Sequence, residues 1–359
     1  MNATILKSSA LALAVGVLSL AGCSKDATDT ATDSSAGGRP TITIVTYDSY
    51  VLDKKVKATV EKDLGVKLEV HASGDGAEAL AAAILTAGRP EGDIFFGVDN
   101  TLLSRAVDGK VFDRVDTATD VPQLQSVPAA LRLDDTGHLV PVDVGPVCVD
   151  YDRQWFDEHH LAPPTSLADL TDPRYKDLLV VESPVTSSTG LVFLVATHAA
   201  LGSDAAKFWT DLVANGVSVS GSWTDAWETQ YTVSGGDRPL VLSYASSPPA
   251  EVVYSDGKVT TPRTGVVTAT CADQIEFAGV LRGSKHPAKA AQVLNAMLGT
   301  PWQASLPLAN FVYPARSDVA EPDLFTKFAP RPSTSIRLDP AAIAEHRDAW
   351  IDEWRTIAG

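Results

Sequence analysis

TITIVT at residues 41–46, followed by VKLEVH at 66–71, EALAAAILT at 78–86 and DIFFG at 93–97, indicates the fold class of this chain. The first segment is rich in β-branched residues, the second alternates and the fourth is short and apolar, so each predicts a strand. The third is rich in alanine and leucine and ends before glycine and proline, so it predicts a helix. Strands that alternate with helices predict an α/β architecture with mostly parallel sheets.

Length and charge limit the classes of function that this chain can have. The chain has 359 residues, 45% of them hydrophobic and 21% charged, and the part from Pro40 to Gly359 suits two domains. The formal net charge of −16 argues against a nucleic-acid partner, because lysine and arginine are not concentrated where they would neutralise phosphates. After the N-terminal segment, no stretch approaches the ~18 continuous apolar residues of a membrane span.

The N-terminal segment has the layout of a secretory signal. Residues 10–21 carry no charge, follow Lys7 and end in small residues before Cys23. This ending resembles the lipobox of bacterial lipoproteins, which implies that residues 1–22 are a signal peptide and that Cys23 carries a lipid anchor. The alternative is an ordinary signal whose cleavage site lies near a cysteine. Residues 23–39 are small and polar, so we expect a flexible tether to the outer face of the cell membrane.

Two cysteines remain after Cys23, namely Cys148 and Cys271. Neither lies in a metal-ligand spacing, and the seven histidines are scattered apart from one adjacent pair, so we expect no metal and no cofactor. In an oxidising compartment the two cysteines could form a disulfide or stay as buried thiols, and the sequence leaves both open.

Polar residues gather at three junctions where a predicted strand passes into a predicted helix. Asp75 suits the N-cap of the alanine-rich helix, TSSTG spans residues 186–190, and YASSP spans 244–248, where Ser247 suits an N-cap. Each junction offers free N–H groups and small hydroxyls, which suit an anion, although each also serves as an ordinary helix cap. Ligands of α/β proteins gather beyond the carboxyl ends of strands, so we expect these junctions to line one cleft.

Aromatic residues lie close to these junctions in the sequence. They are Tyr47, Trp223, Tyr244, Phe311 and Tyr313. Aromatic rings at strand ends stack on flat heterocycles or hold a cation, although they also fill cores. An aromatic-lined cleft that also suits an anion fits a flat cationic ligand with a phosphate or hydroxyl end.

Short segments that follow one another along the chain carry a resemblance to a known family. They are YDS at 47–49, DG at 75–76, GVDNTLL at 97–103, VD at 142–143 with Gly145, Trp223, VLSY at 241–244, SSP at 246–248, YP at 313–314 and AWIDEW at 349–354. The ordered set resembles the thiamine-binding lipoproteins and periplasmic proteins of bacterial thiamine ABC importers. It covers essentially the whole chain after the tether.

The resemblance implies the type II solute-binding fold, in which two α/β lobes are joined by two crossing hinge strands. Lobe one is expected at residues 40–143 plus 271–359, and lobe two at 144–270. The expected hinge strands are residues 146–152 and 264–270.

Two further expectations concern the hinge and the last helix. Cys148 and Cys271 lie near the two crossings, so a hinge disulfide is a hypothesis. The last helix begins at Asp339 and Pro340, and its apolar stripe is expected to pack against lobe one.

The resemblance also implies a function. The protein is expected to be a monomeric, extracytoplasmic lipoprotein without enzymatic activity, which captures thiamine or a thiamine phosphate and delivers it to an ABC transporter permease. The expected ligand-binding residues are Tyr47, Asp75, Gly76, Ser187, Ser188, Trp223, Tyr244, Ala245, Ser246 and Ser247. The serines would bind the hydroxyl or phosphate end, and the aromatic rings would pack on the two heterocycles. Asp75 would lie near the cationic part or act only as a cap.

Three positions depart from the family pattern. The chain has Val144-Gly145-Pro146 where the family often has an aromatic residue on each side of the glycine. Ala250 stands where the family has a tyrosine, and Phe311 stands where it has a tryptophan. We therefore expect a less aromatic cage.

Other functions stay open at this point. A ferric site of this fold usually needs adjacent tyrosines, and the chain has no Tyr-Tyr pair. A thiaminase-like enzyme would need Cys148 as its nucleophile, but no histidine or carboxylate is adjacent to it in the sequence. A polyamine site would need converging acidic groups, and the candidates are Asp48, Asp75, Asp99, Asp143 and Asp225.

Overall fold

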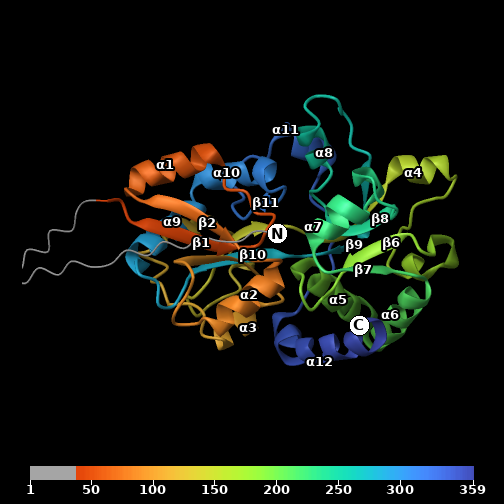
Figure 1. Ribbon diagram of the computed structural model, residues 1–359, viewed down its shortest axis with the longest axis horizontal. Coiled ribbons are helices and arrows are strands. Elements are labelled where there is room, and N and C mark those ends of the chain that lie inside the picture. Colours follow the sequence, from red (N-terminus) through yellow and green to blue (C-terminus); the bar gives the residue numbers. More distant parts are fainter. Residues whose placement is uncertain (1–37) are drawn as a thin grey trace, which may run out of the picture. The chain divides into compact units, whose positions relative to one another are not determined.

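Two β-sheets organise the structure, a computed structural model that describes residues 38–359 (Figure 1). The first sheet has the strand order β11-β4-β10-β3-β1-β2, and the second has the order β7-β6-β8-β5-β9. The first consists of β1 (Thr41–Thr46), β2 (Lys67–Ala72), β3 (Ile94–Asp99), β4 (Val140–Val144), β10 (Ile275–Val280) and β11 (Tyr313–Pro314). The second consists of β5 (Val147–Asp152), β6 (Leu179–Glu182), β7 (Ser218–Ser220), β8 (Leu240–Tyr244) and β9 (Thr264–Ala272).

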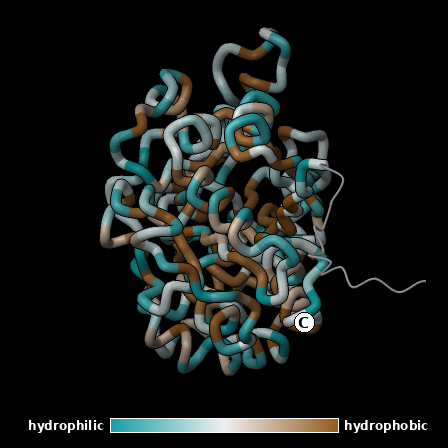
Figure 2. Tube along the Cα trace, turned by 90° about the vertical axis from the view of Figure 1, so that its left-hand side faces the viewer, coloured by the Kyte–Doolittle hydropathy of each residue, from teal (hydrophilic) through white to brown (hydrophobic). Residues whose placement is uncertain are grey.

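Helices cover both sheets and bury their apolar faces. One face of the first sheet packs against α1 (Lys54–Leu64), α9 (Pro287–Met297) and α10 (Thr300–Ala309), and the other against α2 (Gly76–Leu85) and α3 (Leu103–Asp108). The second sheet packs against α5 (Ser188–Leu201), which lies beside α6 (Ala205–Ala214) and α12 (Pro340–Ala358). The shorter helices are α4 (Arg153–Glu158), α7 (Trp223–Asp225), α8 (Pro249–Tyr254) and α11 (Asp323–Phe328). Figure 2 shows the apolar stretches running through the interior.

The α/β class is confirmed, but the expectation of mostly parallel sheets is wrong. Strand β1 pairs in parallel with β2 and β3, whereas β10 is antiparallel to both β3 and β4. In the second sheet, β5 is likewise antiparallel to β8 and β9. Strands β5 and β10 each follow a crossing between the sheets, so they begin at the edge where their neighbouring strands end and run antiparallel to them. The carboxyl ends of β1, β3, β4, β8 and β9 therefore lie at the edges where the chain crosses between the sheets.

Two adjacent crossings join the sheets, as the type II fold requires, and this prediction is confirmed. The chain passes from β4 to β5 through Gly145 and from β9 to β10 through Gln274, and the Gly145 N–H donates to the Gln274 carbonyl at 3.0 Å. Cys148 in β5 and Cys271 in β9 form a disulfide, so the hinge disulfide hypothesis is also confirmed. The exact division into lobes stays a prediction.

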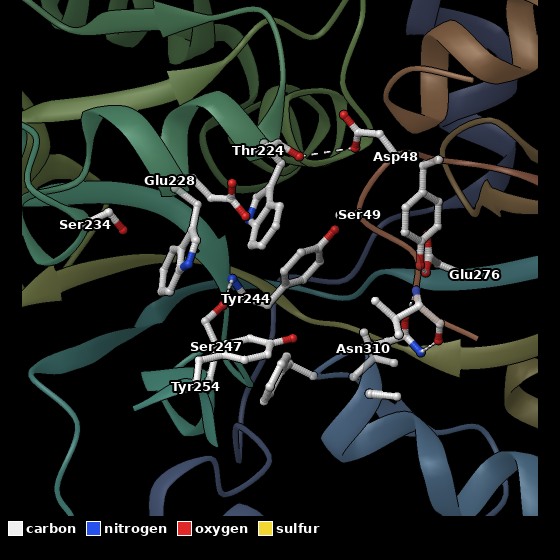
Figure 3. Close-up of a pocket in the computed structure, with 18 residues that line it drawn as sticks. Asp48, Ser49, Thr224, Glu228, Ser234, Tyr244, Ser247, Tyr254, Glu276 and Asn310 are labelled. Atoms are coloured by element: carbon white, nitrogen blue, oxygen red, sulfur yellow. Dashed lines mark hydrogen bonds between the residues drawn. The ribbon is translucent and has the colours of Figure 1, made fainter. Parts of the chain in front are cut away.

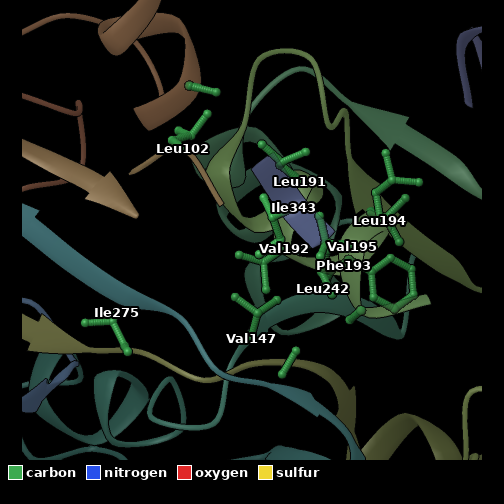
Figure 4. Close-up of a cluster of buried hydrophobic side chains, with 14 of the residues drawn as sticks. Leu102, Val147, Leu191, Val192, Phe193, Leu194, Val195, Leu242, Ile275 and Ile343 are labelled. Atoms are coloured by element: carbon green, nitrogen blue, oxygen red, sulfur yellow. The ribbon is translucent and has the colours of Figure 1, made fainter. Parts of the chain in front are cut away.

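The last helix begins at Pro340 with Asp339 as its cap, as predicted, but its expected packing against lobe one is wrong. Helix α12 packs on α6 and α5, beside the second sheet. The Trp354 ring meets the Trp209 ring edge to face at 6.1 Å, and Trp350 stacks on His198. Figure 4 shows Ile343 among the side chains of α5. The apolar stripe of α12 is thus core, but core of the other half of the chain.

One stretch of the described residues is long and apolar enough to cross a membrane, contrary to the sequence prediction. It spans Ser188–Ala214, which comprises α5 and α6. Helix α5 is apolar on all sides because it is buried on all sides, and a 3₁₀ turn at Gly202–Asp204 separates it from α6. The stretch therefore forms core of the second half. The predicted signal peptide at 1–22 and the lipidated Cys23 lie outside the described residues.

Candidate ligand-binding site

A cavity of about 620 Å³ lies where strand ends from both sheets meet (Figure 3). Tyr47, just after β1, and Glu276 of β10 line it beside the first sheet. Trp223 of α7 and Tyr244 of β8 line it beside the second sheet. In Figure 3, Glu276 and Asn310 lie on one side and Glu228 on the other. A second cavity of about 20 Å³ shares Tyr47, Trp223, Tyr244 and Glu276, and reaches Asp75, Gly76 and Ser188.

Asp75 connects the two halves of the site. It caps α2, as predicted, because its Oδ1 accepts from the Gly76 N–H at 2.6 Å. The same oxygen accepts from the Ser188 N–H at 3.2 Å, and Oδ2 accepts from the Trp223 N–H at 3.0 Å. Burial raises the pKa of Asp75, while these N–H groups oppose the rise. One carboxylate thus joins the first turns of α2, α5 and α7.

Replacing Asp75 with alanine should lower ligand affinity by about five- to thirtyfold, which corresponds to ~1–2 kcal/mol for a lost cap. Three N–H groups lose their acceptor, and those of Ser188 and Trp223 belong to the half of the site beside the second sheet. Asp339→Ala is the matched control, because Asp339 caps α12 and does not line the cavity. Calorimetric titration measures the ligand affinity of both variants. Equal affinities in the two variants would contradict a connecting role for Asp75.

The four predicted serines occupy different places. Ser188 lines the smaller cavity, where its buried Oγ lies close to Gly76 and Asp99. Ser247 lines the larger cavity, where its Oγ bonds to the Ser243 Oγ at 2.8 Å. The predicted helix cap at Ser247 is wrong, because α8 begins at Pro249 with Pro248 as the cap.

Three predicted site residues line neither cavity. Ser187 is buried and bonds to the Thr189 Oγ1 at 2.9 Å. Ala245 packs against the disulfide cysteines, and the buried Ser246 Oγ has no partner. The neighbours of these residues face the cavities, whereas they themselves face the core.

Aromatic rings form two walls of the larger cavity. Trp223 stacks with Trp227 at 5.8 Å with an interplanar angle of 11°, and its Nε1 donates to the Ser243 Oγ at 3.0 Å. Tyr254 meets Phe311 edge to face at 5.4 Å. Tyr313 was expected among the cleft aromatics, and this expectation is wrong, because Tyr313 is fully buried against Phe325 and belongs to the core. Ala250 and Phe311 line the cavity, so two of the three departures from the family pattern lie in its wall.

Sequence reasoning missed Trp227, Tyr254 and Glu276. Trp227 follows Trp223 by four residues, a spacing that places two side chains on one helical face. Tyr254 falls on the last turn of α8 and carried no such signal. Glu276 lies in an apolar strand and resembles an ordinary outward-facing residue.

Glu276 is buried and accepts a hydrogen bond from the Tyr47 hydroxyl at 3.0 Å. Burial, with the nearby Asp99 and Asp75, raises the pKa of Glu276 to about 7. The site therefore contains a carboxyl group that titrates near neutral pH.

A cavity lined from two α/β halves, which are joined by two crossing strands, defines the protein as a two-lobed solute-binding protein. Residues 90–334 match the family of bacterial extracellular solute-binding proteins, and the chain belongs to this family.

Several known proteins are similar to this chain over most of its length. The thiamine-binding periplasmic protein of Salmonella typhimurium is 29% identical over 328 residues, which cover 89% of this chain and 94% of the relative. The thiamine-binding periplasmic protein of Escherichia coli is 29% identical over 325 residues, 88% of this chain and 93% of the relative. The solved structure of a periplasmic thiamin binding protein matches with a TM-score of 0.78 and 27% identity, over 89% of this chain and 97% of that one.

Proposed function

We propose that this protein captures thiamine in the cavity between its sheets and delivers it to an ABC importer. The observation that carries the proposal is the chemistry of the cavity, in which aromatic walls stand beside the buried Glu276 and Asp75. Within residues 38–359, neither cavity is lined by lysine or arginine. Aromatic faces and uncompensated carboxylates favour a flat cation, and thiamine carries a thiazolium ring and an aminopyrimidine. The relatives named for thiamine binding support the same ligand.

The proposed pose follows from this distribution of groups. Trp223 and Tyr244 pack against the rings, and the hydroxyl end of the ligand points toward the smaller cavity, which Ser188 lines. Gly76, Tyr47 and Ser247 complete the contacts. Ala245, Ser246 and Ser187 support the loops behind these residues rather than touching the ligand.

The proposal extends to the cellular setting. Cys23 carries the lipid anchor, residues 23–39 form the tether, and a monomer presents its ligand to the permease outside the cytoplasm. Radiolabelled palmitate incorporation that disappears in Cys23→Ala would support the anchor, and incorporation that persists would contradict it.

The alternative functions lose support at specific residues. Cys148 is buried and forms a disulfide, so it has no thiolate to serve a thiaminase reaction. Of the five acidic groups considered for a polyamine, Asp48 and Asp75 line the cavities, whereas Asp99, Asp143 and Asp225 do not.

A thermal-shift comparison of thiamine, thiamine monophosphate, spermidine and ferric citrate tests the choice of ligand. A ligand at a hundred times its Kd stabilises the folded state by about 2.7 kcal/mol, so a true ligand should raise the melting temperature by several degrees. We expect this rise with thiamine and not with spermidine or ferric citrate. A rise with spermidine alone would replace thiamine by a polyamine.

A further inference from the structure

Glu276 belongs to a row of three carboxyl side chains on neighbouring strands. It lies opposite Asp99 of β3 and opposite Asp143 of β4, in two antiparallel pairs. Residues directly opposite one another in antiparallel strands point to the same face of the sheet. The three carboxyl groups therefore lie side by side at the end of the first sheet that meets the cavity.

Of these three carboxyl groups, only that of Glu276 lines the cavities. Asp99 stabilises the turn before α3, because its Oδ1 accepts hydrogen bonds from the N–H groups of Thr101 and Leu102. Asp143 is fully buried, and neither of its carboxyl oxygens has a hydrogen-bond partner. Glu276 is thus the member of this row that can contact a ligand in the cavity.

Within residues 38–359, no lysine, arginine or histidine lines either cavity beside this row. The titratable groups that act on Glu276 from the neighbouring elements are all acids or phenols. They are Tyr47, Tyr50, Asp75, Asp99, Asp143 and Tyr244. Burial and adjacent carboxylates both disfavour ionisation, so burial and Glu276 raise the pKa of Asp143 well above its usual range. When the cavity is empty, the row is therefore stabilised by holding protons.

We propose that Glu276, positioned by the Tyr47 hydroxyl, is the group that binds the positive charge of the ligand, and that it releases a proton to solvent when the cation enters. The inference rests on the proposed function, since it requires a cationic ligand. On binding, the O–H bond of the Glu276 carboxylic acid breaks, the proton passes to water or buffer, and the carboxylate pairs with the cation. The affinity for the ligand therefore depends on pH.

The sign of the pH dependence follows from this exchange. Below about pH 7 the empty site must first lose a proton, so affinity should rise by up to tenfold per pH unit as the pH increases. Above about pH 8 Glu276 is already ionised, so affinity should level off. The free energy of ligand binding is therefore most favourable at alkaline pH.

Calorimetric titration of the purified protein with thiamine, in buffers of different ionisation enthalpy at pH 6.5 and 8.5, measures the released protons. We expect release of most of one proton at pH 6.5 and close to none at pH 8.5. Glu276→Gln should abolish the release and the pH dependence, and lower affinity at pH 8.5 by about tenfold or more. Asp48→Asn is the matched control, because it removes an exposed carboxylate from the same cavity and should keep the release.

Tyr47→Phe provides a second test if Glu276→Gln does not fold. The Tyr47 hydroxyl lowers the pKa of Glu276, so its loss should shift the pH profile to higher pH while the ring stays in place. Thiamine binding without proton release at pH 6.5, or release that persists in Glu276→Gln, overturns the inference and leaves the proposed function standing. Failure of thiamine to bind at either pH overturns both.

Discussion

Trp223→Ala is expected to weaken thiamine binding by about ten- to hundredfold, which corresponds to ~1.4–2.7 kcal/mol. The indole ring of Trp223 lies in the cavity wall, backed by Trp227 at 5.8 Å and fixed by its hydrogen bond to Ser243. Alanine removes the stacking face and leaves the Ser243 hydroxyl with one partner fewer. Titration calorimetry at a fixed pH gives the change in Kd directly.

Trp155→Ala is the control for this prediction. Trp155 lies in α4, stacks on His159 at 3.8 Å and does not line the cavity. Its loss should lower stability but leave the Kd unchanged. If both variants bind thiamine equally well, the aromatic wall is packing and not a ligand site.

Replacing both hinge cysteines with serine should lower the free energy of unfolding by about 2–5 kcal/mol and the melting temperature by about 5–15 °C. The bond between Cys148 and Cys271 links positions 123 residues apart, so its removal frees a long loop in the unfolded chain. Both sulfurs are buried and neither residue lines the cavity, so the Kd for thiamine should change little. Scanning calorimetry with and without thiamine separates the two effects. An unchanged melting temperature would show that the bond contributes nothing to stability.

Local patterns in the sequence predicted the parts of the fold that depend on local chemistry. The β-branched run at 41–46 forms β1, and Asp75 caps α2, because strand formation and capping are decided within a few residues. The relative direction of β10 and the packing of α12 depend on where distant segments return. No local pattern encodes that path, so the sheets proved mixed and α12 proved to pack beside the second sheet.

The candidate site was predictable in part for the same reason. Tyr47, Asp75, Trp223 and Tyr244 follow strands whose carboxyl ends meet, and the rule for ligand positions in α/β folds finds them. Glu276 was not predicted, because it lies near the start of β10, which is antiparallel to its neighbours. The rule concerns the carboxyl ends of strands and does not apply there.

Titration of the purified protein with thiamine at pH 8 tests the central claim most directly. A single site per chain with a sub-micromolar Kd is the predicted result, because aromatic stacking and an ionised Glu276 then act together on the cation. Absence of a binding heat up to millimolar thiamine, at two temperatures, would contradict the claim and leave a solute-binding protein for another ligand.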